Sequence, residues 1–177
     1  WYASPLKALS NSKYAEFSAK FGAHLVGILT GDRKENTDAP VIIGTTEILR
    51  NQLYDAMHRG ETLATDLVIL DEAHYLGDDE RGVVWEETMI YLPRRIPLLM
   101  LSATIGNADD IAHWLSSVRH RSCLVVREFN RPVPLSPLFL HPTGTLFPLT
   151  TSKDKKNRIR LHKKVRTYLG DKRPLLM

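Results

Sequence analysis

Short, continuous runs of apolar residues recur along the first 126 positions of the chain. The four clearest runs are residues 41–43, 67–70, 98–101 and 123–126, and a weaker one covers residues 24–29. Continuous rather than alternating apolar character is typical of strands that are covered on both faces in a parallel sheet. These runs therefore predict five buried strands.

Segments with helical spacing of apolar residues lie between the runs, at residues 5–21, 47–58 and 107–115. The third segment opens with Asn107, a good N-cap, and carries Asp109 and Asp110 in its first turn. Alternating strands and helices predict the α/β class, with a parallel sheet, helices on both faces and right-handed crossovers.

The pattern changes after residue 131. Five prolines fall between residues 132 and 148, which predicts extended chain or loop rather than core. Residues 155–169 then predict a basic amphipathic helix whose apolar face holds Leu161, Val165, Tyr168 and Leu169. We favour packing of that face on a neighbouring domain, with non-specific attraction to nucleic acid as the alternative.

Composition excludes several classes of protein. At 43% hydrophobic residues the chain is too apolar for a disordered protein, yet no apolar run approaches the ~20 residues of a membrane span. Cys123 is the single cysteine, which excludes an internal disulfide and a cysteine-based zinc site. No secretory leader opens the chain. We expect an intracellular, cytoplasmic protein without a membrane partner.

Charge is distributed unevenly. The net charge is +4, but residues 153–173 alone carry a balance of +8, which leaves −4 for the remainder of the chain. A uniformly basic surface would indicate nucleic acid directly. Here the body of the protein is mildly acidic, so its function has to be read from motifs.

Polar residues follow three of the predicted strands. Thr45 and Thr46 follow the run at 41–43, Asp71-Glu72-Ala73-His74 follows the run at 67–70, and Ser102-Ala103-Thr104 follows the run at 98–101. Ligands of open α/β sheets bind at the carboxyl ends of the strands. The sequence therefore predicts one polar edge of the sheet that holds all three segments.

Asp71 and Glu72 offer two carboxylates at a strand end, where side-chain direction alternates and should send them to opposite sides. One can hold a hydrated Mg²⁺, and the other can activate an attacking water as a general base. Ser102 and Thr104 can supply hydrogen-bonding partners to this cluster. The competing interpretation is a solvated turn in which Asp71 caps a following helix, and the Ser-Ala-Thr segment after the next strand disfavours it.

In order along the chain, Ser4 to Asn11, Gly31-Asp32, Thr45 to Arg50, Asp71 to His74 and Ser102 to Thr104 resemble motifs Ia to III of superfamily 2 helicases, the DEAD/DEAH-box proteins. Arg81 to Glu87 and Arg131 to Leu135 are similar to the superkiller-like (Ski-type) branch, which contains RNA helicases. The resemblance covers about residues 1–140 and implies a RecA-like, P-loop NTPase fold.

The resemblance also implies roles for individual residues. Asp71 would hold Mg²⁺ on the phosphates of ATP through water, Glu72 would activate the hydrolytic water, and His74 would couple that site to Ser102 and Thr104. The residues that would contact RNA or single-stranded DNA are Pro5, Lys7, Asn11, Gly31, Thr45, Thr46 and Arg50. The Ski-type likeness favours RNA.

A P-loop is not found in the sequence. The two glycine pairs five residues apart, Gly22/Gly27 and Gly77/Gly82, are not followed by Lys-Ser/Thr. We therefore expect residues 1–135 to be a partial first RecA-like domain that lacks the N-terminal P-loop strand and helix. Residues 136–177 would lead, through a Pro-rich segment and the basic helix, towards a second RecA-like domain.

The first hypothesis is thus part of an ATP-dependent helicase, inactive as these 177 residues alone. A non-catalytic, helicase-like scaffold or nucleic-acid-binding module is the alternative. A metal-dependent phosphohydrolase built on Asp71, Glu72 and His74 is a weaker one, because two-metal sites recruit carboxylates from further strand ends and only Glu47 is available there.

Overall fold

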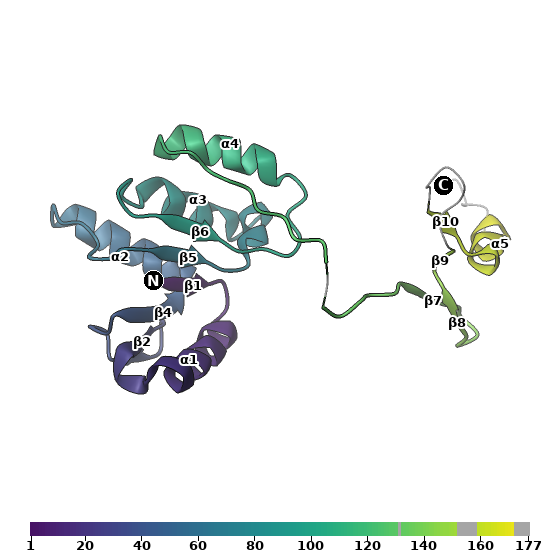
Figure 1. Cartoon of the computed structure of the whole chain (residues 1–177), viewed down its shortest axis with the longest axis horizontal. Helices are drawn as coiled ribbons and strands as arrows, with labels where there is room; N and C mark the ends of the chain where they lie inside the picture. Colours follow the sequence, from purple (N-terminus) through teal and green to yellow (C-terminus); the bar gives the residue numbers. More distant parts are fainter. Residues whose placement is uncertain (131, 152–158, 172–177) are drawn as a thin grey trace. The chain divides into compact units, whose positions relative to one another are not determined.

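The computed structural model describes residues 1–130, 132–151 and 159–171 (Figure 1). The chain divides into two compact units, Trp1–Val126 and Arg127–Met177. The predicted domain boundary after residue 135 falls inside the second unit. The family resemblance implied that boundary, and it stays a prediction.

The first unit is built on a sheet that has six strands in the described residues, in the order β3-β2-β4-β1-β5-β6. All neighbours are parallel except β2 and β3. The strands are β1 (Tyr2–Ser4), β2 (Val26–Leu29), β3 (Lys34–Glu35), β4 (Val41–Thr45), β5 (Val68–Leu70) and β6 (Leu98–Met100). The helices are α1 (Lys7–Phe21), α2 (Thr46–His58), α3 (Gly82–Tyr91) and α4 (Ala108–Arg119), with short 3₁₀ turns η1 (Ala23–Leu25) and η2 (Ala73–Gly77).

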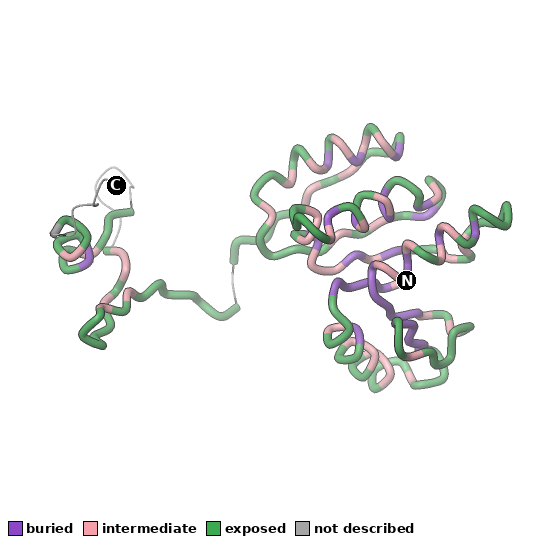
Figure 2. Tube along the Cα trace, turned by 180° about the vertical axis from the view of Figure 1, so that it is seen from behind, coloured by how far each residue is buried: buried purple, intermediate pink, exposed green. Residues whose placement is uncertain are grey.

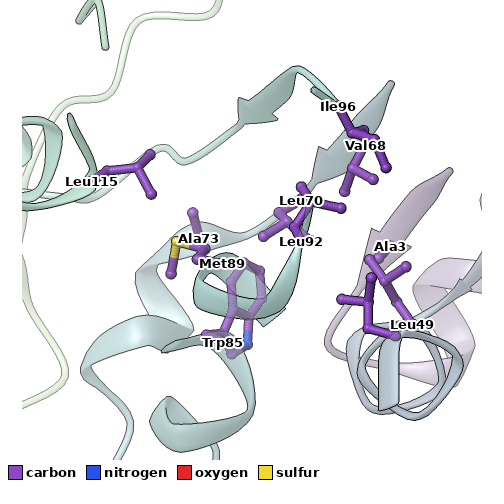
Figure 3. Packing of buried hydrophobic residues seen from close by; sticks show 11 residues of the cluster. Ala3, Leu49, Val68, Leu70, Ala73, Trp85, Met89, Leu92, Ile96 and Leu115 are labelled. Carbon is purple, nitrogen blue, oxygen red and sulfur yellow. The ribbon is translucent and has the colours of Figure 1, made fainter. Parts of the chain in front are cut away.

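Alternate residues of the central strand β1 face opposite helical layers. Tyr2 packs with Val26 and Ile43 against α1, while Ala3 lies in a larger cluster beneath α2, α3 and α4. Ten side chains of the larger cluster, among them Trp85 of α3, are labelled in Figure 3. Helices therefore cover both faces of the sheet, which confirms the predicted class. Figure 2 shows that the central strands are buried, together with parts of the helices that cover them.

Four of the five predicted strands are confirmed, and the fifth is wrong. Residues 123–126 form no strand, and Leu124 and Val126 are 86% and 92% exposed. A strand needs a neighbour to pair its N–H and C=O groups. Within the described residues the sheet ends at β6, so this apolar run has no strand beside it. Only its first residue is anchored, because the Cys123 N–H donates to Ser116 Oγ at 3.0 Å.

The parallel sheet brings the carboxyl ends of five strands to one edge, which we call the carboxyl rim. In sheet order, the segments that leave the rim begin after β2, β4, β1, β5 and β6. Backbone hydrogen bonds hold neighbouring segments together there: the Asp71 N–H donates to Ala3 O at 2.9 Å, and the Ala73 N–H donates to Leu101 O at 2.8 Å. The predicted polar edge is thus formed.

The second unit contains two antiparallel pairs and a helix. The pairs are β7 (Leu138–Leu140) with β8 (Leu146–Pro148), and β9 (Thr150–Thr151) with β10 (Arg160–Leu161); α5 (Lys163–Asp171) follows. The helix predicted at 155–169 begins only at Lys163. Leu161 is in β10, so its assignment to the helix is wrong, and residues 155–158 lie outside the described part of the chain.

Of the predicted apolar face of α5, Val165 is fully buried and Leu169 is 49% exposed. The Tyr168 ring contacts Phe139 and His141 of the β7–β8 hairpin, with ring centroids 5.6 and 4.8 Å away. The helix therefore packs on a hairpin of its own unit. No helix in the described ranges is long and apolar enough to cross a membrane.

Candidate functional site

The carboxylate of Asp71, directly after β5, is held at both oxygens. The Tyr2 hydroxyl donates to Oδ2, and the Glu72 N–H donates to Oδ1 at 2.9 Å. Tyr2 is buried on the α1 face of the sheet; burial, reinforced by the hydrogen bond to Asp71, raises the pKa of the Tyr2 phenol. The phenol thus remains a donor at neutral pH. Each oxygen of Asp71 keeps a lone pair for a further partner.

Glu72 adopts the left-handed backbone conformation, with φ 60° and ψ 44°. This conformation is rare for residues other than glycine, and such residues cluster at functional sites. Strand alternation does not apply to the two carboxylates, so the expectation that it separates them is wrong. Strand β5 ends at Leu70, and the chain turns at Glu72 into η2.

The side chain of Glu72 is in contact with His74. Glu72 Oε2 lies 3.2 Å from His74 Nδ1, and the two side chains are 37% and 40% exposed. The carboxylate is therefore oriented by a neighbour while it stays open to solvent. That is the environment a group needs if it is to accept a proton from water.

Ser102 and Thr104 follow β6 and are exposed at the rim. The Thr104 N–H donates to Ser102 Oγ at 3.3 Å, so the two residues form a local turn. In the described residues, no hydrogen bond joins His74 to either of them. The rim brings these segments to neighbouring strand ends, and the coupling role of His74 stays a prediction.

The donors at this part of the rim fit a hard cation such as Mg²⁺, which takes oxygen ligands and keeps several waters. Asp71 offers a carboxylate whose orientation is fixed, and Ser102 and Thr104 offer exposed hydroxyls after the neighbouring strand β6. The described residues bring together no group of three or more His, Cys, Asp or Glu side chains that could hold a metal ion.

Lys7 and Gly31 meet on the other half of the rim. Lys7 is the first residue of α1, and a Cβ on Gly31 would come within 3.9 Å of Lys7 Nζ. Lys7 Nζ also lies 3.1 Å from Asp32 Oδ1, which accepts a further hydrogen bond from Thr30 Oγ1 at 2.9 Å. The hydrogen bond from Thr30 and then that from Lys7 lower the pKa of Asp32, so this carboxylate is ionised beside the lysine.

Two helix N-termini open at the same half of the rim. Helix α1 follows β1 after Pro5, and α2 begins directly after β4 at Thr46. The first N–H groups of a helix lack intrahelical partners and attract anions. Thr46 is buried, and its Oγ1 has no hydrogen-bond partner in the described residues. Thr45 is buried beside it at the end of β4.

A hydrogen-bond network connects the two helix starts. Ser10 Oγ lies 2.9 Å from Ser4 Oγ and donates to Gly44 O at 3.0 Å, which ties α1 to β1 and β4. Pro5 is buried, and its carbonyl accepts a hydrogen bond from Arg81 Nη1 at 3.4 Å. Because Pro5 is buried, we expect a ligand to contact the backbone around Pro5 rather than its ring.

Arg50 and Asn11 are both engaged by neighbours. Arg50 Nη1 of α2 lies 3.3 Å from Glu87 Oε2 of α3, and the guanidinium lies over the Tyr54 ring. Asn11 Oδ1 of α1 accepts a hydrogen bond from Arg33 Nη1 at 3.1 Å. Arg50 thus links two helices, and its predicted contact with nucleic acid stays a prediction.

Tyr2 and Arg33 were not identified from the sequence. Tyr2 precedes the first motif and belongs to a strand of three residues, so no apolar run marked it. Arg33 stands in a loop among five charged residues between 32 and 38, where nothing in the sequence distinguishes one charge from the next. Its contact with Asn11 depends on the pairing of β2 with β3 beside α1.

Comparison with known proteins identifies the family that this chain matches. Residues 1–111 match the DEAD/DEAH box helicase family. The chain is 45% identical over 157 residues to the chloroplastic DExH-box ATP-dependent RNA helicase DExH15 of Arabidopsis thaliana, covering 86% of this chain and 13% of that protein. It is 48% identical over 146 residues to the ATP-dependent RNA helicase mtr4 of Schizosaccharomyces pombe, covering 81% and 12%.

The antiviral helicase SKI2 of Saccharomyces cerevisiae is 45% identical over 136 residues, covering 76% of this chain and 10% of that protein. The chain therefore spans between 10% and 13% of the length of these three relatives. These likenesses confirm the expected Ski-type branch.

Two solved structures share the fold. Dbp5 of Saccharomyces cerevisiae bound to RNA and ADP BeF3 gives a TM-score of 0.51 at 20% identity, over 72% of this chain and 33% of that one. The Hef helicase domain of Pyrococcus furiosus gives 0.50 at 21% identity, over 74% and 29%. The expected RecA-like fold is thereby confirmed.

Proposed function

The chain belongs to the DEAD/DEAH box helicase family, and from this premise we propose that it forms part of the motor of an ATP-dependent RNA helicase. The observation that carries the proposal is the order of segments along the carboxyl rim. Candidate nucleic-acid contacts follow β2, β4 and β1, whereas the candidate nucleotide residues follow β5 and β6. One rim would thus hold two adjoining functions.

At the nucleotide half, Asp71 would hold Mg²⁺ through water, and Glu72 would accept a proton from the attacking water. Bound Mg²⁺ would supply charge neutralisation at the phosphates of ATP. The hydrogen bonds from Tyr2 and from the Glu72 N–H support a fixed orientation of Asp71. The contact with His74 supports a fixed orientation of the Glu72 carboxylate.

At the other half, the backbone of one nucleic-acid strand would run past Lys7, Asn11, Gly31, Thr45 and Thr46. Phosphate contacts need N–H groups, hydroxyls and an occasional cation, but no strongly basic face. The N-termini of α1 and α2 and the orphaned Thr46 hydroxyl support this assignment. Arg50 would act at the same face while it is held by Glu87.

We favour RNA over single-stranded DNA because the relatives DExH15 and mtr4 are named RNA helicases. A second RecA-like domain outside these residues would complete the nucleotide site, and a P-loop would cradle the phosphates. An RNA substrate also supports an intracellular location, with the cytoplasm as the expected compartment.

The proposal is tested by ATP hydrolysis measured on the protein from its complete reading frame, with no polymer, with single-stranded RNA and with single-stranded DNA. We expect hydrolysis that RNA stimulates more than DNA. Stimulation by DNA alone would overturn the choice of substrate. No hydrolysis, with RNA binding retained, would favour the non-catalytic scaffold, and hydrolysis of phosphoesters without ATP would favour a metal-dependent phosphohydrolase.

Asp32→Asn is expected to tighten RNA binding about threefold at low salt, because it removes a carboxylate that competes with phosphate for the Lys7 ammonium. Fluorescence anisotropy of a labelled single-stranded RNA measures the change. Asp38→Asn removes an equal charge from the next loop, between β3 and β4, and serves as the control. Equal tightening by both variants would show a general charge effect and contradict a specific role of the ion pair.

A further inference from the structure

One face of α1 is lined by the loop that joins β2 to β3. Lys7, Asn11 and Tyr14 are spaced four and three residues apart, so they share a stripe along the helix. Asp32 pairs with Lys7, Arg33 donates to Asn11, and Tyr14 donates to Glu35 at 3.3 Å. The loop and strand β3 therefore follow the stripe, and Arg33 contacts its middle residue.

Arg33 is held in place by Glu35 and Tyr14. Its Nε and Nη2 donate to the two carboxylate oxygens of Glu35 at 2.7 and 3.0 Å, which is a bidentate pair. The guanidinium lies over the Tyr14 ring, 4.7 Å from the centroid. These contacts leave Nη1 directed at Asn11 Oδ1, 3.1 Å away. A half-buried arginine is thus given a defined orientation.

The contact fixes which side of the Asn11 amide is presented outward. A guanidinium has donors only, so the atom of Asn11 that faces Arg33 has to be the carbonyl oxygen. The opposite side of the amide is the NH₂ group, which carries two donors. Asn11 itself is exposed, one helical turn beyond Lys7. A donor at this position is what a phosphate oxygen requires.

We propose that Arg33 is a positioning residue that orients the Asn11 amide for a phosphate of the bound strand. The proposal rests on the function proposed above, in which Asn11 contacts nucleic acid. Arg33 acts through Asn11, and Glu35 acts through Arg33. The charge of Arg33 is balanced by Glu35, so its contribution to binding is one of orientation rather than net charge.

The test is the affinity of the complete protein for labelled single-stranded RNA, measured by anisotropy across a range of salt concentrations. We expect Asn11→Ala to weaken binding about tenfold and Arg33→Ala about fivefold, as for loss of a hydrogen bond to a charged group. The double variant should be no weaker than Asn11→Ala alone, because the two residues act in series. The salt dependence should be unchanged, since no phosphate contact by a cation is lost.

Glu35→Ala best distinguishes a simple charge effect from the positioning role. The two explanations predict changes in RNA affinity of opposite sign. Removal of a negative charge near a polyanion would tighten binding if charge alone mattered. If Glu35 holds Arg33, the same change weakens binding about threefold, within the range of a lost charged hydrogen bond. Lys34→Ala is the matched control for Arg33→Ala, because it removes an equal charge from the next residue, in β3; we expect a change of less than twofold.

The outcomes separate this inference from the function on which it rests. If Asn11→Ala leaves RNA affinity unchanged, the proposed nucleic-acid track is wrong at this residue, and the role of Arg33 fails with it. If Asn11→Ala weakens binding but Arg33→Ala does not, only the positioning role is overturned. The third outcome is that the losses of RNA affinity in the two single variants add up in the double variant, and that Arg33→Ala has a smaller salt dependence. Arg33 would then contact phosphate directly, which would also overturn the positioning role.

Discussion

Replacement of Glu72 by Gln is expected to lower the rate of ATP hydrolysis by about 1,000-fold, within the range of general-base contributions, while ATP and RNA binding persist. The amide has the shape of the carboxylate and can keep the contact with His74 Nδ1, now 3.2 Å away. It cannot accept a proton from the attacking water. The loss should therefore appear in kcat rather than in the affinities.

The rate should be measured on the complete protein with saturating RNA, and binding on the same preparation with a labelled nucleotide and a labelled RNA. Glu86→Gln is the matched control, because Glu86 is an exposed glutamate of α3. It should hydrolyse ATP at the normal rate. Hydrolysis by Glu72→Gln within a few-fold of normal would refute the assignment of the base, and loss of nucleotide binding would indicate a damaged site instead.

The sequence predicted the rim well because its physical cause is local. Each apolar run forms a strand, parallel strands end at the same edge, and the polar residues that follow them must gather there. This argument placed Thr45, Asp71 and Ser102 at one edge of the sheet without knowledge of any contact. The roles of these residues came from the family resemblance, and they remain to be tested.

What the sequence did not predict depends on neighbours that are distant along the chain. Strand β1 has only three residues, and it forms because β4 and β5 pair with it on either side. The apolar run at 123–126 has the right composition for a strand, but in the described part of the chain no strand pairs with it. Helix α3 carries apolar residues on all sides, including the exposed Val83 and Ile90, so no amphipathic period revealed it.

The sequence also did not predict how the side chains of the site residues are oriented. Nothing in the order of residues indicates that the Tyr2 hydroxyl meets Asp71, or that Arg33 meets Asn11. Both contacts join segments that approach only in the folded sheet. They decide which atoms face outward, so candidate residues can be named from motifs while their geometry has to come from the structure.

Arg119 has a structural role, and its contacts lie before the start of β6 rather than at the carboxyl rim. It is the last residue of α4, only 5% exposed, and its guanidinium donates to four carbonyls at the end of α3 and in the turn before β6. The acceptors, with donor–acceptor distances, are Met89 O (3.2 Å), Leu92 O (2.9 Å), Pro93 O (3.3 Å) and Ile96 O (2.7 Å). Met89 O and Leu92 O lie at the C-terminus of α3, where intrahelical donors are lacking, and Pro93 O and Ile96 O lie in the turn that follows.

Burial, followed by repulsion from Arg121, lowers the pKa of Arg119 without removing its charge, because the pKa of an arginine guanidinium starts far above neutrality. The side chain thus satisfies several buried acceptors at once and joins α4, α3 and the approach to β6. Methionine at this position would fill similar space but donate no hydrogen bond. The carbonyls would then lose the guanidinium as their donor.

Arg119→Met is therefore expected to destabilise this part of the first unit by about 3 kcal/mol, the scale of several buried acceptors left unpaired. Hydrogen exchange of the complete protein should show amides of α3 and β6 exchanging roughly 100-fold faster.

Arg121→Met is the control, because Arg121 is exposed and donates to Arg94 O and Arg95 O nearby. It should change exchange by less than about threefold, in line with surface substitutions. Equal exchange in the two variants would mean that water replaces the guanidinium without cost, and the packing of α4 on α3 would then need no buried charge.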